Sequence, residues 1–121
     1  MAKTILVVED FQDTRVLIKF MLERLGYQVL EAENGWQAVE SVKRQVPDLI
    51  LMDMALPYTD GLAATKLIRQ IKETSKIPII AFTASGEFIR DQALQAGCDD
   101  FLMKPIESEE LQSVLDKYLG K

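Results

Sequence analysis

The chain contains no histidine, one cysteine and no long apolar run. Without histidine it cannot form a histidine-based metal site or catalytic triad, nor carry phosphohistidine. Cys98 has no partner for an intramolecular disulfide, which is typical of a reducing compartment. No segment has the roughly 20 consecutive apolar residues that span a bilayer, and "MAKTILVVED" reaches acidic residues too early for a signal peptide. We therefore expect a cytoplasmic protein with no membrane association.

Basic residues are also few, with 14 Lys and Arg against 19 Asp and Glu, for a net charge of −5. This balance argues against a nucleic-acid partner, because such proteins usually present a basic face to the phosphates. The hydrophobic fraction of 48% and the charged fraction of 27% are ordinary for a globular protein. No repeat, low-complexity tract or linker interrupts the 121 residues, so we expect one domain covering 1–121.

Apolar runs alternate with helical patterns along the chain. The runs predict strands at 4–8, 27–32, 48–53, 77–83 and 100–104. Helices are predicted between them by apolar residues at helical spacing, namely Leu17, Met21 and Leu25 before Gly26; Ala38, Val39 and Val42; Ala64, Leu67, Ile68 and Ile71 after Gly61; "EFIRDQALQAG", ending at Gly97; and 108–119. Five strands alternating with five helices predict a doubly wound α/β fold with a five-stranded parallel sheet.

Polar residues stand where the predicted strands end. Those residues are Glu9 and Asp10 after the first strand, Asp53 at the third, Thr83 and Ala84 at the fourth, and Lys104 before Pro105 at the fifth. In such folds functional groups collect at the carboxyl ends of the strands, so we expect these side chains to converge.

Three carboxylates brought together would repel one another unless a cation neutralised them. A site with oxygen ligands only favours Mg²⁺. With the metal bound, Asp53 could act as a nucleophile toward a phosphoryl group, with Lys104 and Thr83 contacting the phosphoryl oxygens. Each residue alone has an ordinary structural interpretation, as a turn, cap or surface residue. Their occurrence together at four strand ends favours the functional one.

The segments "VVEDFQDTR", "ILMDMALPYTDG", "IIAFTA" and "AGCDDFLMKP" occur in an order and spacing that resemble the receiver domain of two-component response regulators, over essentially the whole chain. This resemblance implies a flavodoxin-like sheet with strand order 2-1-3-4-5. It implies Asp53 as the phosphoacceptor and Mg²⁺ as the cofactor.

The resemblance also implies a role for each matching residue. Asp10, Asp53 and the backbone carbonyl of Ala55 would bind Mg²⁺ directly, and Glu9 would bind it through water. Thr83 and Lys104 would contact the phosphoryl group, Thr83 and Phe101 would act as switch residues, and Ala84 would leave space beside Thr83. The bond before Pro105 would be cis, and Pro57 and Gly61 would belong to the loop after the phosphorylation site. Phe101 has no hydroxyl, so any signal that passes through it must be steric.

The function implied is that of a phosphorylation-activated regulator, not an enzyme beyond its own phosphorylation and dephosphorylation. The expected partners are a histidine kinase or histidine phosphotransfer protein and a target on the face made by the fourth helix, fifth strand and fifth helix. We expect a monomer or weak dimer, and an effect exerted through another protein because the chain ends at Lys121.

Other readings stay open. The chain could be a phosphorelay intermediate that passes the phosphoryl group to another protein's histidine, a non-phosphorylated pseudo-receiver, or an excised piece of a longer protein. A phosphohydrolase resembling the haloacid dehalogenase group is disfavoured, because that group has a second aspartate where this chain has Ala55.

Overall fold

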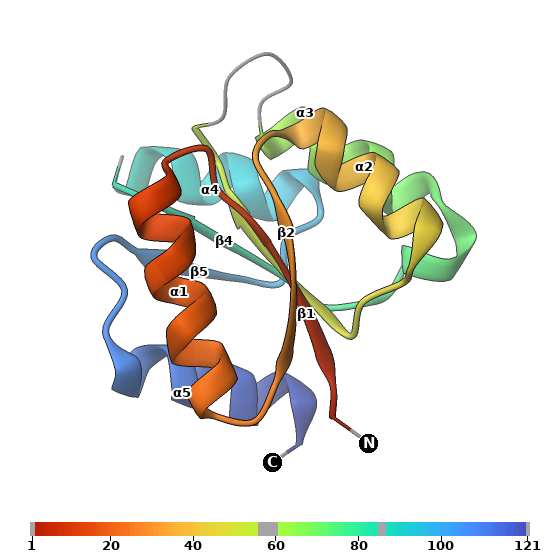
Figure 1. Ribbon diagram of the computed structural model, residues 1–121. Helices are drawn as coiled ribbons and strands as arrows, with labels where there is room; N and C mark the ends of the chain where they lie inside the picture. The colour runs from red at the N-terminus through yellow and green to blue at the C-terminus, as the bar shows by residue number, and fades with distance from the viewer. Residues whose placement is uncertain (1, 56–60, 85–86, 121) are drawn as a thin grey trace.

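The computed structural model describes residues 2–55, 61–84 and 87–120, and the side chains of Glu87 and Phe88 are not described. Strands and helices alternate through these residues (Figure 1). The strands are β1 (Thr4–Val8), β2 (Gln28–Ala32), β3 (Leu49–Asp53), β4 (Ile79–Thr83) and β5 (Asp100–Met103). The helices are α1 (Gln12–Arg24), α2 (Gly35–Arg44), α3 (Gly61–Gln70), the short 3₁₀ helix η1 (Lys72–Thr74), α4 (Glu87–Ala96) and α5 (Ser108–Leu119).

The five strands form one parallel sheet in the order β2-β1-β3-β4-β5. This confirms the predicted fold class and strand order. The expected strand bounds differ by at most two residues. The fourth strand begins at Ile79 instead of residue 77. Pro78 has no N–H to give to a neighbouring strand, although its carbonyl accepts the N–H of Ile50 at 2.9 Å.

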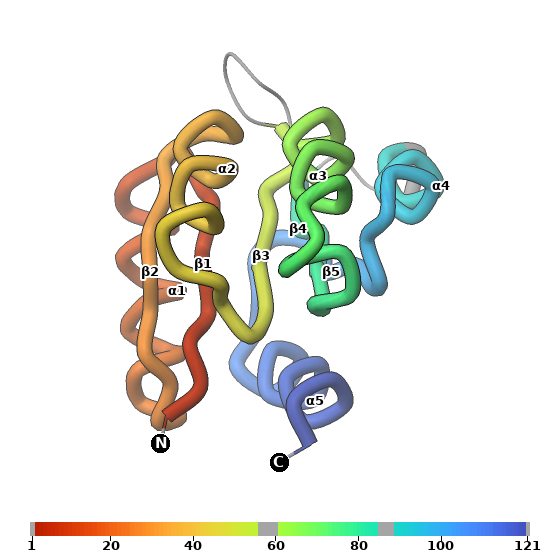
Figure 2. Tube along the Cα trace, turned by 90° about the vertical axis from the view of Figure 1, so that its right-hand side faces the viewer, coloured from red at the N-terminus to blue at the C-terminus, as the bar shows by residue number. Residues whose placement is uncertain are grey.

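The sheet is covered on both faces, as the unbroken apolar character of β1, β3 and β4 requires. One core layer packs α1 and α5 on the sheet and includes Ile18, Leu22, Leu111 and Leu115. The other packs α2, α3 and α4 on the opposite face. Figures 1 and 2 show these helices on either side of the twisted strands. The carboxyl ends of the strands lie at the end of the molecule away from the two termini (Figure 1).

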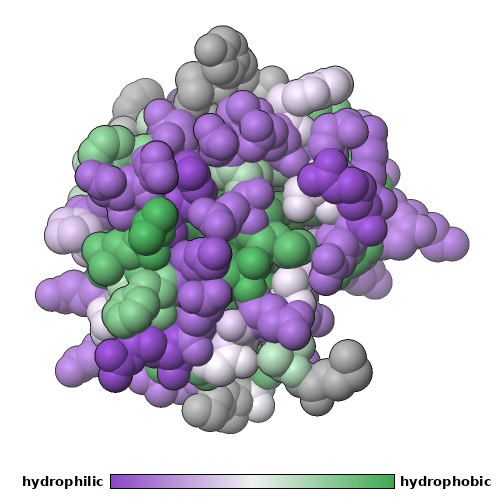
Figure 3. Space-filling model, viewed as in Figure 1, coloured by the Kyte–Doolittle hydropathy of each residue, from purple (hydrophilic) through white to green (hydrophobic). Residues whose placement is uncertain are grey.

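Of the three apolar residues whose spacing predicts α1, Met21 and Leu25 pack partly buried against the core layer, but Leu17 does not. Ile18 and Leu22 are buried, whereas Leu17 is 57% exposed. Apolar residues on α1 occupy more than one stripe, so their spacing alone does not decide which stripe meets the sheet. Apolar side chains consequently gather on the outer surface where α1 lies (Figure 3).

The apolar spacing of α3 predicts that Ala64, Leu67 and Ile68 face the core. Ala64 and Ile68 are buried, whereas Leu67 is 42% exposed. Among the described residues, no helix is long and apolar enough to cross a membrane.

Candidate phosphoacceptor and metal site

Three carboxylates meet at the carboxyl edge of the sheet. Glu9 and Asp10 follow β1 and Asp53 ends β3, and these two strands are neighbours at the point where the strand order reverses. One oxygen from each of the three groups lies within 4.8 Å of the other two. Glu9 and Asp53 are buried, whereas Asp10 is exposed. The predicted convergence of the acidic residues is therefore present in the structure.

Lys104 lies between the two buried carboxylates. It follows β5, and its backbone N–H donates to the Thr83 carbonyl at 3.0 Å. Its ammonium donates to Glu9 Oε1 at 2.5 Å and to Asp53 Oδ2 at 3.2 Å. The same ammonium lies 5.2 Å from the centroid of the Phe82 ring. Lys104 thus joins the ends of β1, β3 and β5 through charge.

The charges of the site do not balance. Three carboxylates face one ammonium, and the pKa values of Asp10 and Lys104 are both raised. Partial loss of hydration, together with hydrogen bonding and repulsion from Glu9, raises the pKa of Asp10 above its ordinary value, although its side chain is still open to solvent. Burial alone would lower the pKa of Lys104, but its contacts with Glu9 and Asp53 outweigh this and raise it. Lys104 is therefore a permanent cation at neutral pH, and the cluster retains excess negative charge.

This donor set fits a hard divalent cation. All the candidate ligand atoms are oxygens, and Asp10 is open to solvent, so a metal ion could enter and keep several waters, as Mg²⁺ prefers. Ala55 is also exposed at this edge. Its backbone N–H donates to Asp53 Oδ1 at 3.0 Å and holds that carboxylate in place. The role of the Ala55 carbonyl as a ligand stays a prediction.

Asp53 and Thr83 end adjacent strands. The register pairs Asp53 with Phe82, and the Met54 N–H donates to the Phe82 carbonyl at 3.1 Å. Thr83, 1% exposed, is the next residue along β4, and Ala84 after it is exposed. The structure thus places the expected hydroxyl-bearing residue and its small neighbour beside the aspartate-bearing strand.

Gly61 is required where α3 begins. A Cβ atom at this position would lie 2.3 Å from the Asp53 backbone oxygen and 2.7 Å from the Met54 Cα, distances that side chains do not tolerate. Glycine therefore lets the start of α3 approach the end of β3. Pro57, the other residue expected in this loop, lies outside the described residues.

Two further expected residues belong to β5 and the turn after it. Phe101 is partly buried and packs against the core layer that contains α2, α3 and α4. The Lys104–Pro105 peptide bond is cis, as the resemblance implies.

Arg15 is a residue that the sequence analysis does not single out. It lies on α1 and is only 9% exposed. Its guanidinium donates from Nη1 to the backbone carbonyl of Glu9 at 2.9 Å, and from Nε to Glu31 Oε1 at 3.1 Å. The sequence offers one signal for this role. Arg15 is a cation on the same helix face as the apolar residues Ile18 and Leu22, and the following strand contains a glutamate, Glu31.

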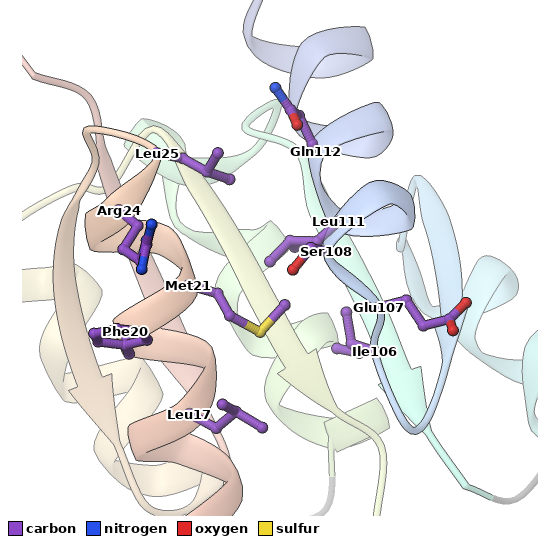
Figure 4. A pocket seen from close by; sticks show the side chains of 10 residues that line it. All are labelled: Leu17, Phe20, Met21, Arg24, Leu25, Ile106, Glu107, Ser108, Leu111 and Gln112. Atoms are coloured by element: carbon purple, nitrogen blue, oxygen red, sulfur yellow. The ribbon is translucent and has the colours of Figure 1, made fainter.

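Beside the site, α1 and the segment leading into α5 enclose apolar surface. A cavity of 320 Å³ is lined by Lys104, Ala84, Pro105, Ile106 and four residues of α1. A second, larger cavity of 640 Å³ lies between α1 and the first part of α5 (Figure 4). In Figure 4, Leu17 and Met21 of α1 and Ile106 and Leu111 on the other side surround this space.

The topology and the acidic edge define a class, the doubly wound α/β proteins with a functional site at the strand-order reversal. A family model described as the response regulator receiver domain matches residues 5–116, and the chain belongs to that family.

Similar proteins agree with this assignment. The chemotaxis protein CheY of Bacillus subtilis is 39% identical over 121 residues, which cover 99% of this chain and 100% of CheY. The receiver domain of sensor histidine kinase PA1611 from Pseudomonas aeruginosa PAO1 is 43% identical, with a TM-score of 0.93 and complete coverage of both chains. That structure has a magnesium ion coordinated in the active site cleft.

A third similar structure contains a partner protein. It is the Saccharomyces cerevisiae histidine phosphotransfer protein Ypd1 with the receiver domain of its downstream response regulator Ssk1. The match is 28% identical, covers 97% of this chain and 88% of the other, and has a TM-score of 0.89.

Proposed function

We propose that this receiver domain accepts a phosphoryl group on Asp53 from a histidine kinase or histidine phosphotransfer protein, and signals through protein contacts. The observation that carries the proposal is the buried Asp53 carboxylate, oriented by the Ala55 N–H and contacted by Lys104 at the edge where Glu9 and Asp10 converge. Aspartate carboxylates are known phosphoryl acceptors, and the two donors orient Asp53 beside the carboxylates that could hold a metal ion.

In the proposed step, an Asp53 carboxylate oxygen forms a bond to phosphorus as the phosphorus–nitrogen bond of the donor's phosphohistidine breaks. The imidazole nitrogen of the donor keeps the electron pair of the broken bond, and the phosphoryl group becomes an acyl phosphate. The Lys104 ammonium, already 3.2 Å from Asp53, stabilises the negative charge on the transferring oxygens. Thr83, at the end of the neighbouring strand, contacts another of those oxygens after transfer.

The proposed cofactor is Mg²⁺, held by Asp10, Asp53, the Ala55 carbonyl and, through water, Glu9. Its support is the all-oxygen donor set and the magnesium ion in the similar receiver domain of PA1611. When bound, it supplies charge neutralisation for the carboxylates and the phosphoryl oxygens. We propose no enzymatic activity beyond the protein's own phosphorylation and dephosphorylation, and a cytoplasmic location.

The proposed downstream contact is the face made by α4, β5 and α5. Its described residues include the partly buried Phe101, the exposed Met103, and the charged residues Arg90, Glu107 and Glu110. Phosphorylation adds roughly −1.5 to −2 charge, as for other phosphorylated side chains. We propose that this charge draws Lys104 and Thr83 toward Asp53 and shifts the population toward a state in which Phe101 turns inward.

A phosphorelay role is the second candidate. The Ypd1–Ssk1 structure, in which a similar receiver domain accompanies a histidine phosphotransfer protein, favours it. In that role Asp53 would pass its phosphoryl group to a histidine of another protein. The similarity to CheY over the full length of both chains instead favours direct output.

Intact-mass spectrometry after incubation with Mg²⁺ and a small acyl phosphate tests the proposal. We expect one phosphoryl adduct that disappears when Mg²⁺ is omitted and in Asp53→Asn. Asp91→Asn, which changes an exposed aspartate of α4, is the matched control and should be labelled like the wild type. Equal labelling of Asp53→Asn would show that the phosphoacceptor is another residue.

Transfer to a purified histidine phosphotransfer protein separates the two roles. Stoichiometric loss of phosphoryl from Asp53 to that protein supports the relay. Phosphorylation-dependent binding to a protein that is not a kinase supports direct output.

A further inference from the structure

The turn between β1 and α1 carries two of the three acidic residues of the site, yet no capping side chain fixes it. Phe11 is the N-cap residue of α1 and its side chain makes no capping hydrogen bond. Asp10, the exposed member of the cluster, lies directly before this uncapped helix end. Something else must hold the peptide between Glu9 and Asp10 in one orientation.

Besides the bond that Lys104 donates to the Glu9 carboxylate, three hydrogen bonds of Glu9 hold this turn. The Glu9 N–H donates to the Ala32 carbonyl at 3.0 Å, and the Phe11 N–H donates to Glu9 Oε2 at 3.0 Å. The third is the bond from Arg15 Nη1 to the Glu9 carbonyl, at 2.9 Å. Because a peptide unit is planar, fixing the Glu9 carbonyl also fixes the plane from which the Asp10 side chain departs.

The guanidinium is itself anchored. Arg15 Nε donates to Glu31 Oε1 at 3.1 Å, and Glu31 also pairs with Lys19 at 3.3 Å. Glu31 lies on β2, where it is paired with Val7 of β1. The planar, five-donor geometry of arginine allows both contacts at once, whereas a lysine ammonium is a single point charge.

We propose that Arg15 is a positioning residue for the metal site, acting through the Glu9 carbonyl to hold the turn that presents Glu9 and Asp10. The inference rests on the proposed function, because it assumes that the acidic cluster binds Mg²⁺. If Arg15 only joined α1 to β2 for stability, its contact with Glu31 would be enough. Its second bond, to the Glu9 carbonyl, reaches the backbone of the acidic turn. Losing such a partner of a metal site typically weakens metal binding about 10–100-fold.

The test is the Mg²⁺ dissociation constant of the unphosphorylated protein, measured by isothermal titration calorimetry on the wild type, Arg15→Gln, Arg15→Lys and Lys19→Gln. We expect Arg15→Gln to bind Mg²⁺ about tenfold more weakly, at the low end of the usual range. Arg15→Lys should also bind more weakly, since one ammonium cannot replace both contacts. Lys19→Gln is the matched control, because Lys19 contacts Glu31 but not the turn, and its Mg²⁺ affinity should equal the wild type's.

Thermal unfolding without Mg²⁺, and then with saturating Mg²⁺, separates positioning from stability. If Arg15→Gln and Arg15→Lys lower the melting temperature but bind Mg²⁺ like the wild type, Arg15 is only structural and the inference is wrong. If Arg15→Gln does not fold, Arg15→Lys alone decides. If the wild type binds no Mg²⁺, the metal part of the proposed function fails and the inference falls with it.

Discussion

Replacing Lys104 by methionine should destabilise the protein most strongly when Mg²⁺ is absent. The substitution keeps a flexible apolar stem of similar length but removes the ammonium that Glu9 and Asp53 share. Both carboxylates are almost fully buried, at 0% and 2% exposure, so each loses a charged partner that water cannot replace. The three neighbouring carboxylates then lose the ammonium that lies among them.

The distances set the size of the effect. At 3.2 Å, one unit pair attracts by about 5 kcal/mol with an effective dielectric constant of 20. Removing one partner from a buried pair usually costs about 3–5 kcal/mol. The Lys104 side chain is 24% exposed, which puts the expected loss near the lower figure, at about 3 kcal/mol.

Urea unfolding followed by circular dichroism measures this loss directly. A divalent cation takes over part of the neutralisation, so Mg²⁺ should stabilise Lys104→Met more than it stabilises the wild type. Lys117→Met is the control, because the Lys117 ammonium is exposed and lies 3.5 Å from Asp100 on the surface; it should change the curve little. A Lys104→Met protein that unfolds at the wild-type urea concentration without Mg²⁺ would refute the reasoning.

Three further results are expected. Gly61→Ala should cost about 3 kcal/mol by overpacking, because its Cβ would meet the Asp53 carbonyl, whereas Gly26→Ala, with open space around its Cβ but a φ of +96°, should cost about 1–2 kcal/mol in urea unfolding through backbone strain alone; equal losses would contradict this. Asp10→Asn should stabilise the Mg²⁺-free protein at pH 7, since a raised folded-state pKa means that stability falls as pH rises through that value; it should also abolish stabilisation by Mg²⁺ in thermal unfolding. Cys98 should resist alkylation at pH 8 until the protein unfolds, because burial raises its pKa to about 11; rapid labelling of native protein would contradict this.

The sequence was sufficient for the fold because its signals agreed with one another. Short β-branched runs such as 4–8 can only be buried strands when helical patterns separate them, and parallel order then follows from right-handed crossovers. The same topology brings Glu9, Asp53 and Lys104 to one edge without any knowledge of side-chain geometry. Most of the candidate site could therefore be predicted before its contacts were known.

Details of orientation could not be predicted. Leu17 and Ile18 are adjacent apolar residues of α1, and only docking on the sheet determines that Ile18 is buried and Leu17 is exposed. Arg15 was missed for a related reason. Its importance depends on a long-range contact with Glu31 and on a bond to a backbone carbonyl, and a lone arginine on an apolar helix face predicts neither partner.

The sharing of one ammonium gives the site a simple means of coupling charge to structure. Lys104 now divides its hydrogen bonds between Glu9 and Asp53. Added phosphoryl charge on Asp53 would shift that division away from Glu9, because the stronger charge attracts the ammonium more. Lys104 follows β5, and its backbone is bonded to Thr83 at the end of β4, so any displacement of its side chain acts on the strand that carries Phe101. A change of charge at β3, the central strand, would thereby displace groups on β5 at the edge of the sheet.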